Sequence, residues 1–132
     1  MDMTEHALAR RQGETVLAEH QTVRALLGRA AVDSAAAREL AARAARERAA
    51  GSPDAVAATV VAKYAAARAA ASVSGSAVQV LGAAGCAPDS RAGRFFRDAK
   101  VMEIIEGSGQ VAELHVADDL LRRVRARTVG GS

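Results

Sequence analysis

A short segment that predicts the end of one helix and the start of the next separates two long helical patterns in this chain. Apolar residues recur at helical intervals from about residue 16 to residue 50, and again from about residue 53 to residue 81. Between the two patterns, Gly51 can close the first helix in a left-handed C-cap. Ser52-Pro53-Asp54 then has the order of an N-cap, a first-turn proline and a first-turn acid. We therefore expect two long helices joined by a tight connection, as in a helical bundle.

The apolar residues of each long segment fall on one stripe. In the first segment the stripe contains Val23, Leu26, Leu27, Ala30, Ala37, Leu40, Ala41 and Ala44. In the second it contains Val56, Val60, Tyr64, Ala67, Ala71, Val78 and Leu81. Half of the chain is apolar, but tryptophan is absent and aromatic residues make up only 2%. Helices that pack closely through small residues are expected, with a core that is weak without a partner.

Three further helices complete the expected fold. One covers residues 2 to 13 and ends near Gly13, one covers about residues 90 to 104, and the last runs from Ser108 to about Arg127. The apolar stripe of the last helix contains Val111, Leu114, Ala117, Leu121 and Val124. Residues 82–85 stop the second long helix, and a loop through Pro88 follows.

No segment is rich enough in strand-forming residues to predict a sheet. The fold class is therefore all-α, an up-and-down helical bundle, with residues 1–128 as a single domain. Residues 129–132 are expected to be a frayed tail.

The basic residues do not indicate a nucleic-acid partner. The formal net charge is +3, and all of the 18 basic residues except Lys63 and Lys100 are arginines. One arginine group interrupts an alanine-rich helix and reads as a solvated face, and a second lies at a helix C-terminus, where cations are favourable. The two groups are Arg38, Arg43, Arg46 and Arg48, and Arg122, Arg123, Arg125 and Arg127. Because stacking aromatic residues and a nucleic-acid motif are missing, we expect no such partner.

Cysteine use and hydropathy suggest a cytoplasmic protein. Cys86 is the only cysteine, so neither a disulfide framework nor a zinc site is expected, and no other metal site is predicted. The N-terminus lacks the basic and apolar regions of a signal peptide. Residues 55–87 are apolar, but Lys63, Arg68 and several serines and glycines interrupt them, so we expect no transmembrane helix and no membrane partner.

The run from Phe95 to Ser108 is the strongest candidate for a functional segment. It ends in a carboxylate, a glycine and a hydroxyl, at Glu106, Gly107 and Ser108, directly before the last expected helix. A carboxylate held between two helices and flanked by methionine and isoleucine should be partly desolvated, which makes it a better base. The alternative is an ordinary solvated glutamate in a helix connection.

Two motifs in this run resemble a known family. Arg97-Asp98-Ala99-Lys100, followed by Ile105-Glu106-Gly107-Ser108, resembles the C-terminal signature of flavin-dependent acyl-CoA dehydrogenases. In that family an R-D-A-K segment leads into an I-Y-E-G-T-type turn; here Ile105 replaces the common tyrosine and Ser108 the common threonine. The resemblance covers about residues 6–121 and implies the family's C-terminal helical domain. It also implies that most of the first bundle helix, the N-terminal helical domain and the middle β domain lie outside this chain.

The resemblance to short- and medium-chain members implies a catalytic role for the turn. Glu106 would remove the α-proton of an acyl thioester while a hydride leaves the β-carbon for the flavin, and Gly107 would lie beside the thioester. This is α,β-dehydrogenation, as in fatty acid metabolism. Use of the flavin for oxygenation, or for substrates bound to a carrier protein, remains open.

The resemblance also implies FAD contacts near the N-terminus. Arg10-Arg11-Gln12 is similar to an R-x-Q/T segment whose arginine and polar residue, here Arg10 and Gln12, reach the pyrophosphate and adenine region. A guanidinium group suits phosphate oxygens. Gly13-Glu14 follows where the family usually has Phe-Gly. Ala18-Glu19-His20-Gln21 matches x-E-H/F-Q, which implies that His20 and Gln21 lie near the cofactor.

Further FAD contacts are implied at two helix ends. Gln79 to Gly85 resembles Q-x-x-G-G-x-G, in which Gln79, Gly82 and Ala83 would approach the dinucleotide of a neighbouring subunit; Ala83 replaces a glycine. By itself this stretch is a helix C-cap. Ser108 and Gln110 would face the flavin, and Ser108 also suits the N-cap of the last helix.

Two hypotheses follow. In the first, the chain is the C-terminal helical part, or a split subunit, of an acyl-CoA or acyl-carrier dehydrogenase. It would form a homo- or hetero-oligomer with an acyl-CoA dehydrogenase-like chain, share FAD with that partner, and bind FAD weakly or not at all when isolated. In the second, it is a non-catalytic helical dimerisation or interaction module derived from that family.

Overall fold

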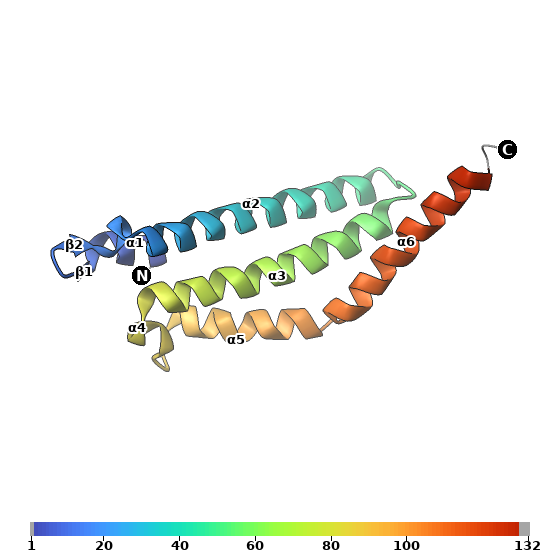
Figure 1. Ribbon diagram of the computed structural model, residues 1–132. Helices are drawn as coiled ribbons and strands as arrows, with labels where there is room; N and C mark the ends of the chain where they lie inside the picture. The colour runs from blue at the N-terminus through green and yellow to red at the C-terminus, as the bar shows by residue number, and fades with distance from the viewer. Residues whose placement is uncertain (1, 130–132) are drawn as a thin grey trace.

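The computed structural model describes residues 2–129. Its elements, in chain order, are α1 (Met3–Ala9), β1 (Arg11–Gln12), β2 (Thr15–Val16), the short 3-10 helix η1 (Leu17–Glu19), α2 (Gln21–Ala49), α3 (Ala55–Leu81), α4 (Ala83–Cys86), α5 (Arg91–Ile104) and α6 (Gly109–Val129). α2, α3 and α5 lie side by side with alternating directions, and α6 leaves them at an angle (Figure 1). The predicted all-α bundle is confirmed.

The connection between α2 and α3 is built from a helix cap that the sequence predicts. Gly51 has a φ of +62°, and its N–H donates to the carbonyl of Arg48 at 3.2 Å. The N–H of Ser52 donates to the carbonyl of Glu47 at 3.0 Å. These two bonds form a Schellman motif, in which a left-handed residue satisfies the last carbonyls of a helix. The predicted left-handed cap at Gly51 is therefore confirmed.

The start of α3 lies slightly later than the sequence suggests. Ser52 accepts a hydrogen bond at 3.1 Å, but from the N–H of Asp54 in the turn. Asp54 is the N-cap residue of α3, and its own side chain makes no capping bond. The prediction that Ser52 is the N-cap is therefore wrong by two positions, because Pro53 and Asp54 form a separate turn before the helix.

Small side chains make up the core. The buried apolar residues are Ala7, Ala30, Ala44, Ala62, Ala67, Val80, Ala92, Ala99 and Ala112, and within residues 2–129 no large side chain is fully buried. Ser72 of α3 adds a polar contact, because its hydroxyl donates to Asp33 of α2 at 2.8 Å. The predicted stripes are correct at Ala30, Ala44 and Ala67 but wrong at Ala41 and Val56, which are exposed. Close approach of helix backbones, and not large anchors, holds this bundle together.

The N-terminal segment contains a β-hairpin that the sequence analysis missed. α1 ends at Ala9, and β1 pairs with β2 in antiparallel register through Arg11 with Val16 and Gln12 with Thr15. Gly13, with a φ of +65°, is the first of the two loop residues, where tight hairpins favour glycine. The predicted helix over residues 2–13 therefore forms but ends at Ala9, four residues early, and the predicted absence of a sheet is wrong.

The corner between α3 and α5 also differs from expectation. Gly82, with a φ of +59°, ends α3 as predicted, but the helical turn α4 follows where a loop was expected. Gly85 lets α4 fold back onto α3, since a Cβ there would lie 2.7 Å from the carbonyl oxygen of Val78. Ser90 then caps α5 by accepting from the N–H of Gly93 at 3.3 Å.

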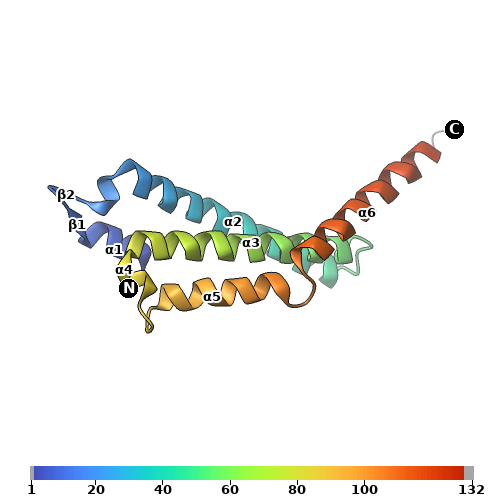
Figure 2. The same ribbon diagram turned by 60° about the horizontal axis from the view of Figure 1, so that its bottom comes forward.

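α6 packs much less than the sequence predicts. Its expected apolar stripe is exposed at Val111, Leu114, Ala117, Leu121 and Val124. Within residues 2–129 no helix covers this stripe, because α6 contacts α3 through other positions, among them Gly109, Glu113 and Arg123, and leaves the bundle at an angle (Figures 1 and 2). Val129 of the predicted tail belongs to α6, and residues 130–132 lie outside the described residues.

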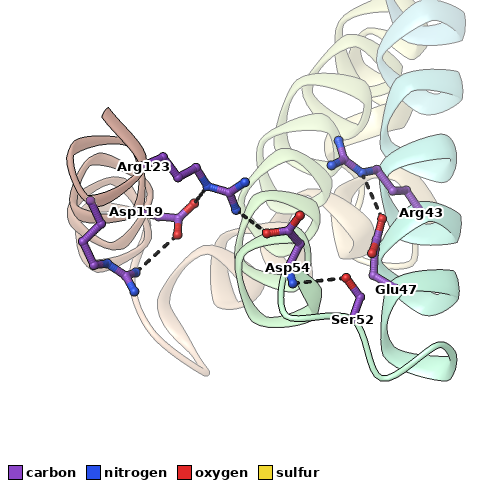
Figure 3. A network of polar contacts seen from close by, with 7 residues as sticks. Arg43, Glu47, Ser52, Asp54, Asp119 and Arg123 are labelled. Atoms are coloured by element: carbon purple, nitrogen blue, oxygen red, sulfur yellow. Dashed lines mark hydrogen bonds and ion pairs between the residues drawn. The ribbon is translucent and has the colours of Figure 1, made fainter. Parts of the chain in front are cut away.

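A polar network ties the far part of α6 to the start of α3. Figure 3 shows Arg123 between Asp119 of its own helix and Asp54. The ion pairs measure 2.6 Å to Asp119 and 2.7 Å to Asp54. They raise the pKa of Arg123 above its ordinary value, first through the hydrogen bond to Asp119 and then through that to Asp54. Arg43 and Glu47 form a separate pair on α2 at 3.9 Å.

α3 is the central helix of the bundle. By length and composition alone it is long and apolar enough to cross a membrane, so the expectation of no transmembrane helix stays a prediction. In the fold, however, α3 lies against α2, α5 and α6. It also carries the half-buried Lys63 and the buried serines Ser74 and Ser76. These contacts and polar residues are those of a central bundle helix.

Candidate functional site

The turn between α5 and α6 carries the most unusual backbone in the chain. Ile105 ends α5 in an extended conformation, and Glu106 and Gly107 then have φ values of +56° and +96°. Glu106 is the only residue other than glycine with a positive φ among residues 2–129. A left-handed conformation costs an L-residue about 1–2 kcal/mol, and such strain is often found at functional sites. The strain lies at the residue predicted to be the base.

Contacts on both sides hold this turn. From α3, the ammonium group of Lys63 donates to the carbonyl oxygen of Gly107. Ser108 is the N-cap of α6: its carbonyl accepts from the N–H of Ala112 at 3.1 Å, and its hydroxyl accepts a long bond of 3.5 Å from the N–H of Val111. The predicted capping position of Ser108 is therefore confirmed. The turn is attached to the central helix as well as to α6.

A polar pocket of about 240 Å³ lies beside the turn. α3, α5 and α6 line it with Lys63, Tyr64, Ala67, Arg68, Lys100, Glu103, Ile104, Ser108, Gly109, Gln110 and Glu113. Of the predicted site residues, the pocket brings together Ser108 and Gln110. Its mixture of cations, carboxylates and donors suits a polar group of a ligand.

Hydrogen bonds order the side chains of this pocket. The Tyr64 hydroxyl donates to Oε1 of Glu113 at 2.6 Å, and Nη1 of Arg68 donates to the same hydroxyl at 3.0 Å. The hydrogen bond to Tyr64 raises the pKa of Arg68 above its ordinary value, so its guanidinium stays charged. Lys100 pairs with Glu103 at 2.7 Å on the α5 side.

Glu106 itself is exposed to solvent. The expected dry surroundings are therefore not supplied by this chain, because no segment of residues 2–129 covers the outer side of the turn. Gly107 is exposed as well. A partner surface would have to desolvate the carboxylate, and the role of Glu106 as a base stays a prediction.

Four predicted cofactor residues lie around the N-terminal hairpin. Arg10 ends α1, Gln12 lies in β1, and Gln21 opens α2; all three side chains are exposed. His20 is half-buried, and its Nε2 is hydrogen-bonded to the Thr15 hydroxyl at 3.2 Å. The hairpin therefore presents a guanidinium and two amides to solvent, while His20 is tied to β2.

Three more lie at the end of α3. The exposed residues Gln79, Gly82 and Ala83 are located where α3 meets α4, at the same end of the molecule as α1 and the hairpin (Figures 1 and 2). A Cβ at Gly82 would meet no atom within 4 Å, so its positive φ is what requires glycine in this chain. The helix-cap interpretation is confirmed, and the approach to a dinucleotide stays a prediction.

The two groups of predicted residues are far apart within one chain. Gly107 is held by Lys63, and Gln79 lies further along the same helix, about 24 Å away at a rise of 1.5 Å per residue. One chain therefore does not bring Glu106 together with Gln79 or Gly82. The two ends can contact opposite parts of a long ligand, or two different ligand molecules.

Sequence reasoning missed the α3 residues beside the turn. Lys63 and Arg68 were interpreted only as interruptions of an apolar segment, and Tyr64 as part of the packing stripe. A signal was present, since a charged side chain on a largely apolar helix needs a partner. Within residues 2–129, no three His, Cys, Asp or Glu side chains come together as metal ligands.

A family model described as "Acyl-CoA dehydrogenase, C-terminal domain" matches residues 1–121. The mitochondrial short-chain specific acyl-CoA dehydrogenase of Rattus norvegicus is 38% identical over 55 residues, which cover 42% of this chain and 13% of that protein. The chain thus spans only a small part of this curated relative.

Solved structures match the whole bundle. Butyryl-CoA dehydrogenase from Megasphaera elsdenii matches with a TM-score of 0.86 at 30% identity, covering 91% of this chain and 31% of that one. Glutaryl-coenzyme A dehydrogenase in complex with glutaryl-CoA matches with a TM-score of 0.86 at 30% identity, covering 90% of this chain and 30% of that one. The similarity is to the helical part of larger enzymes.

Proposed function

The chain belongs to the acyl-CoA dehydrogenase family, whose C-terminal domain it matches, and on that premise we propose that it is the helical part of a flavin-dependent acyl thioester dehydrogenase. Glu106 would be the base, and the family's other domains, outside residues 1–132 on a longer chain or on a partner chain, would complete the enzyme. The strained backbone of Glu106, held from α3 through Gly107, is the observation that carries this proposal. A glutamate in a left-handed turn is costly, and a fixed direction for its carboxylate explains that cost.

The residues of the turn have separate tasks in the proposed reaction. Glu106 takes the α-proton of the acyl thioester. Gly107 leaves room beside the thioester, since a Cβ there would meet no protein atom within 4 Å. Ser108 presents a hydroxyl at the start of α6, and Gln110 lines the pocket next to it. FAD held in the completed site would supply the acceptor for the hydride that leaves the β-carbon.

The residues at the hairpin end fit a phosphate-containing cofactor. Within residues 2–129 the Arg10 side chain makes no hydrogen bond or ion pair, which leaves its guanidinium available for phosphate oxygens. Gln12 and Gln79 add exposed amides, and Gly82 leaves its surroundings open. All of these groups are exposed, so a protein surface beyond residues 2–129 must complete the site. We expect the isolated chain to bind FAD weakly or not at all; a purified yellow protein with stoichiometric flavin would contradict this.

The base is tested by Glu106→Gln in the complex formed with the partner chain. Turnover of butyryl-CoA should fall by a factor of about 10²–10⁴, the usual contribution of a general base, because the amide cannot take the proton. Exchange of the substrate's α-protons with solvent should fall as well. Glu39→Gln, an exposed glutamate of α2, is the matched control and should leave both rates unchanged.

A non-catalytic interaction module is the second candidate. Large apolar side chains are exposed along α5 and α6, among them Phe96, Ile104, Leu114, Leu120 and Leu121. Exposed apolar surface of this extent marks a surface that associates with another protein. If the activity of the complex survives Glu106→Gln, Glu106 is not the base and the module is the better explanation. A cytoplasmic location is part of either proposal, consistent with the exposed free thiol of Cys86.

A further inference from the structure

Lys63 makes an unusual long-range contact. It is half-buried in the first third of α3, and its ammonium donates to the carbonyl oxygen of Gly107, 44 residues later in the chain. Among residues 2–129 it forms no ion pair with a carboxylate. A half-buried charge is stabilised only when it has a partner, and here the partner is a main-chain carbonyl.

The Gly107 carbonyl lies inside the turn between α5 and α6, so the contact from Lys63 holds the turn itself. The bond from Lys63 is the only hydrogen bond that reaches residues 105–108 from outside α5 and α6 in the described part of the chain. It fixes the peptide unit that joins Gly107 to Ser108, directly after the left-handed Glu106. Without it, the turn would be held only at its two ends, by α5 and by the N-cap of α6.

The next residue of α3 supports the same region. A Cβ at Gly109 would lie 3.7 Å from Cε2 of Tyr64, so the Tyr64 ring packs against the first residue of α6. The Tyr64 hydroxyl also bonds to Glu113 one turn later. Lys63 and Tyr64 therefore hold the chain on both sides of Ser108.

We propose that Lys63 is a positioning residue, which holds the Gly107 carbonyl and thereby sets the direction of the Glu106 carboxylate. The catalytic part of this inference rests on the proposed function of Glu106. The part that concerns how Lys63 holds the turn is independent of that function and is tested separately on the chain alone.

The first test is amide hydrogen exchange in the isolated chain of residues 1–132. In Lys63→Met, which keeps most of the side chain but lacks a donor, the amides of Val111 and Ala112 should exchange about tenfold faster, as expected for loss of one hydrogen bond from a charged group. The matched control is Lys100→Met, which removes the other lysine and should leave these amides unchanged. Equal exchange in Lys63→Met and the unaltered chain would overturn the proposal.

A rescue experiment covers the case in which Lys63→Met unfolds the chain. In a Cys86→Ser background, Lys63→Cys is treated with 2-bromoethylamine, which forms a thioether side chain ending in an amine at nearly the lysine length. Restored slow exchange at Val111 and Ala112 supports the proposal. Exchange that stays fast after complete alkylation contradicts it, since the amine alone should then hold the turn.

The second test separates positioning from the identity of the base. In the complex with the partner chain, Lys63→Met should lower kcat for butyryl-CoA about tenfold while KM changes little, and it should add nothing to Glu106→Gln. If Glu106→Gln abolishes turnover but Lys63→Met leaves kcat intact, the positioning role is wrong. If Glu106→Gln itself leaves turnover intact, the proposed function fails, and the exchange experiment still decides whether Lys63 holds the turn.

Discussion

The α2–α3 pair and α6 each carry an apolar stripe, but the stripes lie in opposite environments. α2 and α3 lie along each other over most of their length and bury small side chains such as Ala30, Ala44 and Ala67. α6 carries larger apolar residues, yet Leu114 is 67% exposed and Ala112 is its only buried residue in the described part of the chain. The large apolar side chains of α6 are thus exposed to solvent, whereas the small side chains of α2 and α3 are buried.

This difference shows what an apolar stripe does and does not establish. A stripe indicates that one face of a helix is buried somewhere, but it does not identify the partner. For α2 and α3 the partner follows directly in the sequence, through the cap at Gly51. For α6 nothing among residues 2–129 covers the stripe, so a second protein surface is needed to bury it.

The largest effect should come from the same substitution made in both regions. Ala44→Leu adds a branched side chain to the buried face of α2 and should destabilise the fold by about 1–3 kcal/mol through overpacking. Ala117→Leu on the exposed face of α6 should change stability by less than about 0.5 kcal/mol. Urea unfolding of the two variants measures the difference. Equal destabilisation would mean that α6 packs in solution against a surface absent from this fold.

A smaller effect is expected for the connection that pairs α2 with α3. Gly51→Ala places a side chain at a φ of +62° and should cost about 1–2 kcal/mol. Gly28→Ala lies within α2, where a Cβ meets no atom within 4 Å, and should stabilise by about 0.5–1 kcal/mol. Thermal unfolding followed by circular dichroism gives both values. A loss of stability in both variants would contradict the assignment of Gly51 as a left-handed cap.

The smallest effect is expected where α6 is attached by charge. Arg123→Met removes the exposed ion pairs to Asp54 and Asp119 and should lower the melting temperature only slightly, with the difference lost at high salt. The pKa of Arg123 is raised in the fold, so its contribution is complete below the ordinary arginine pKa and is lost only as the pH rises through the raised value. The small difference should therefore not change between about pH 6 and pH 9. A large loss of stability at high salt would show that packing, and not charge, attaches α6.

Features encoded by neighbouring residues could be predicted from the sequence. Gly51 and Gly82 end their helices with a positive φ, and Ser90 and Ser108 cap theirs, because each signal acts within one turn of the chain. The hairpin at residues 11–16 was missed because its strands are only two residues long, too short for an alternating pattern.

The candidate site was less predictable from its own residues. Its motifs indicated the family, and residues 105–108 were located correctly as a turn. The left-handed backbone at Glu106 could not be foreseen, since glutamate does not favour it and contacts outside the turn must maintain it. The contact from Lys63 joins residues 44 positions apart, and no local pattern encodes such a pair.

Attachment of the turn to α3 has a mechanical consequence. The start of α6 is fixed to α3 by contacts at Gly107, Gly109 and Glu113, so once the Arg123–Asp54 ion pair breaks, the outer part of α6 swings only beyond these residues. A partner that captures and reorients the outer helix would therefore leave the Glu106 backbone in register with α3. Binding of a partner to the outer part of α6 would therefore leave the direction of the Glu106 side chain unchanged.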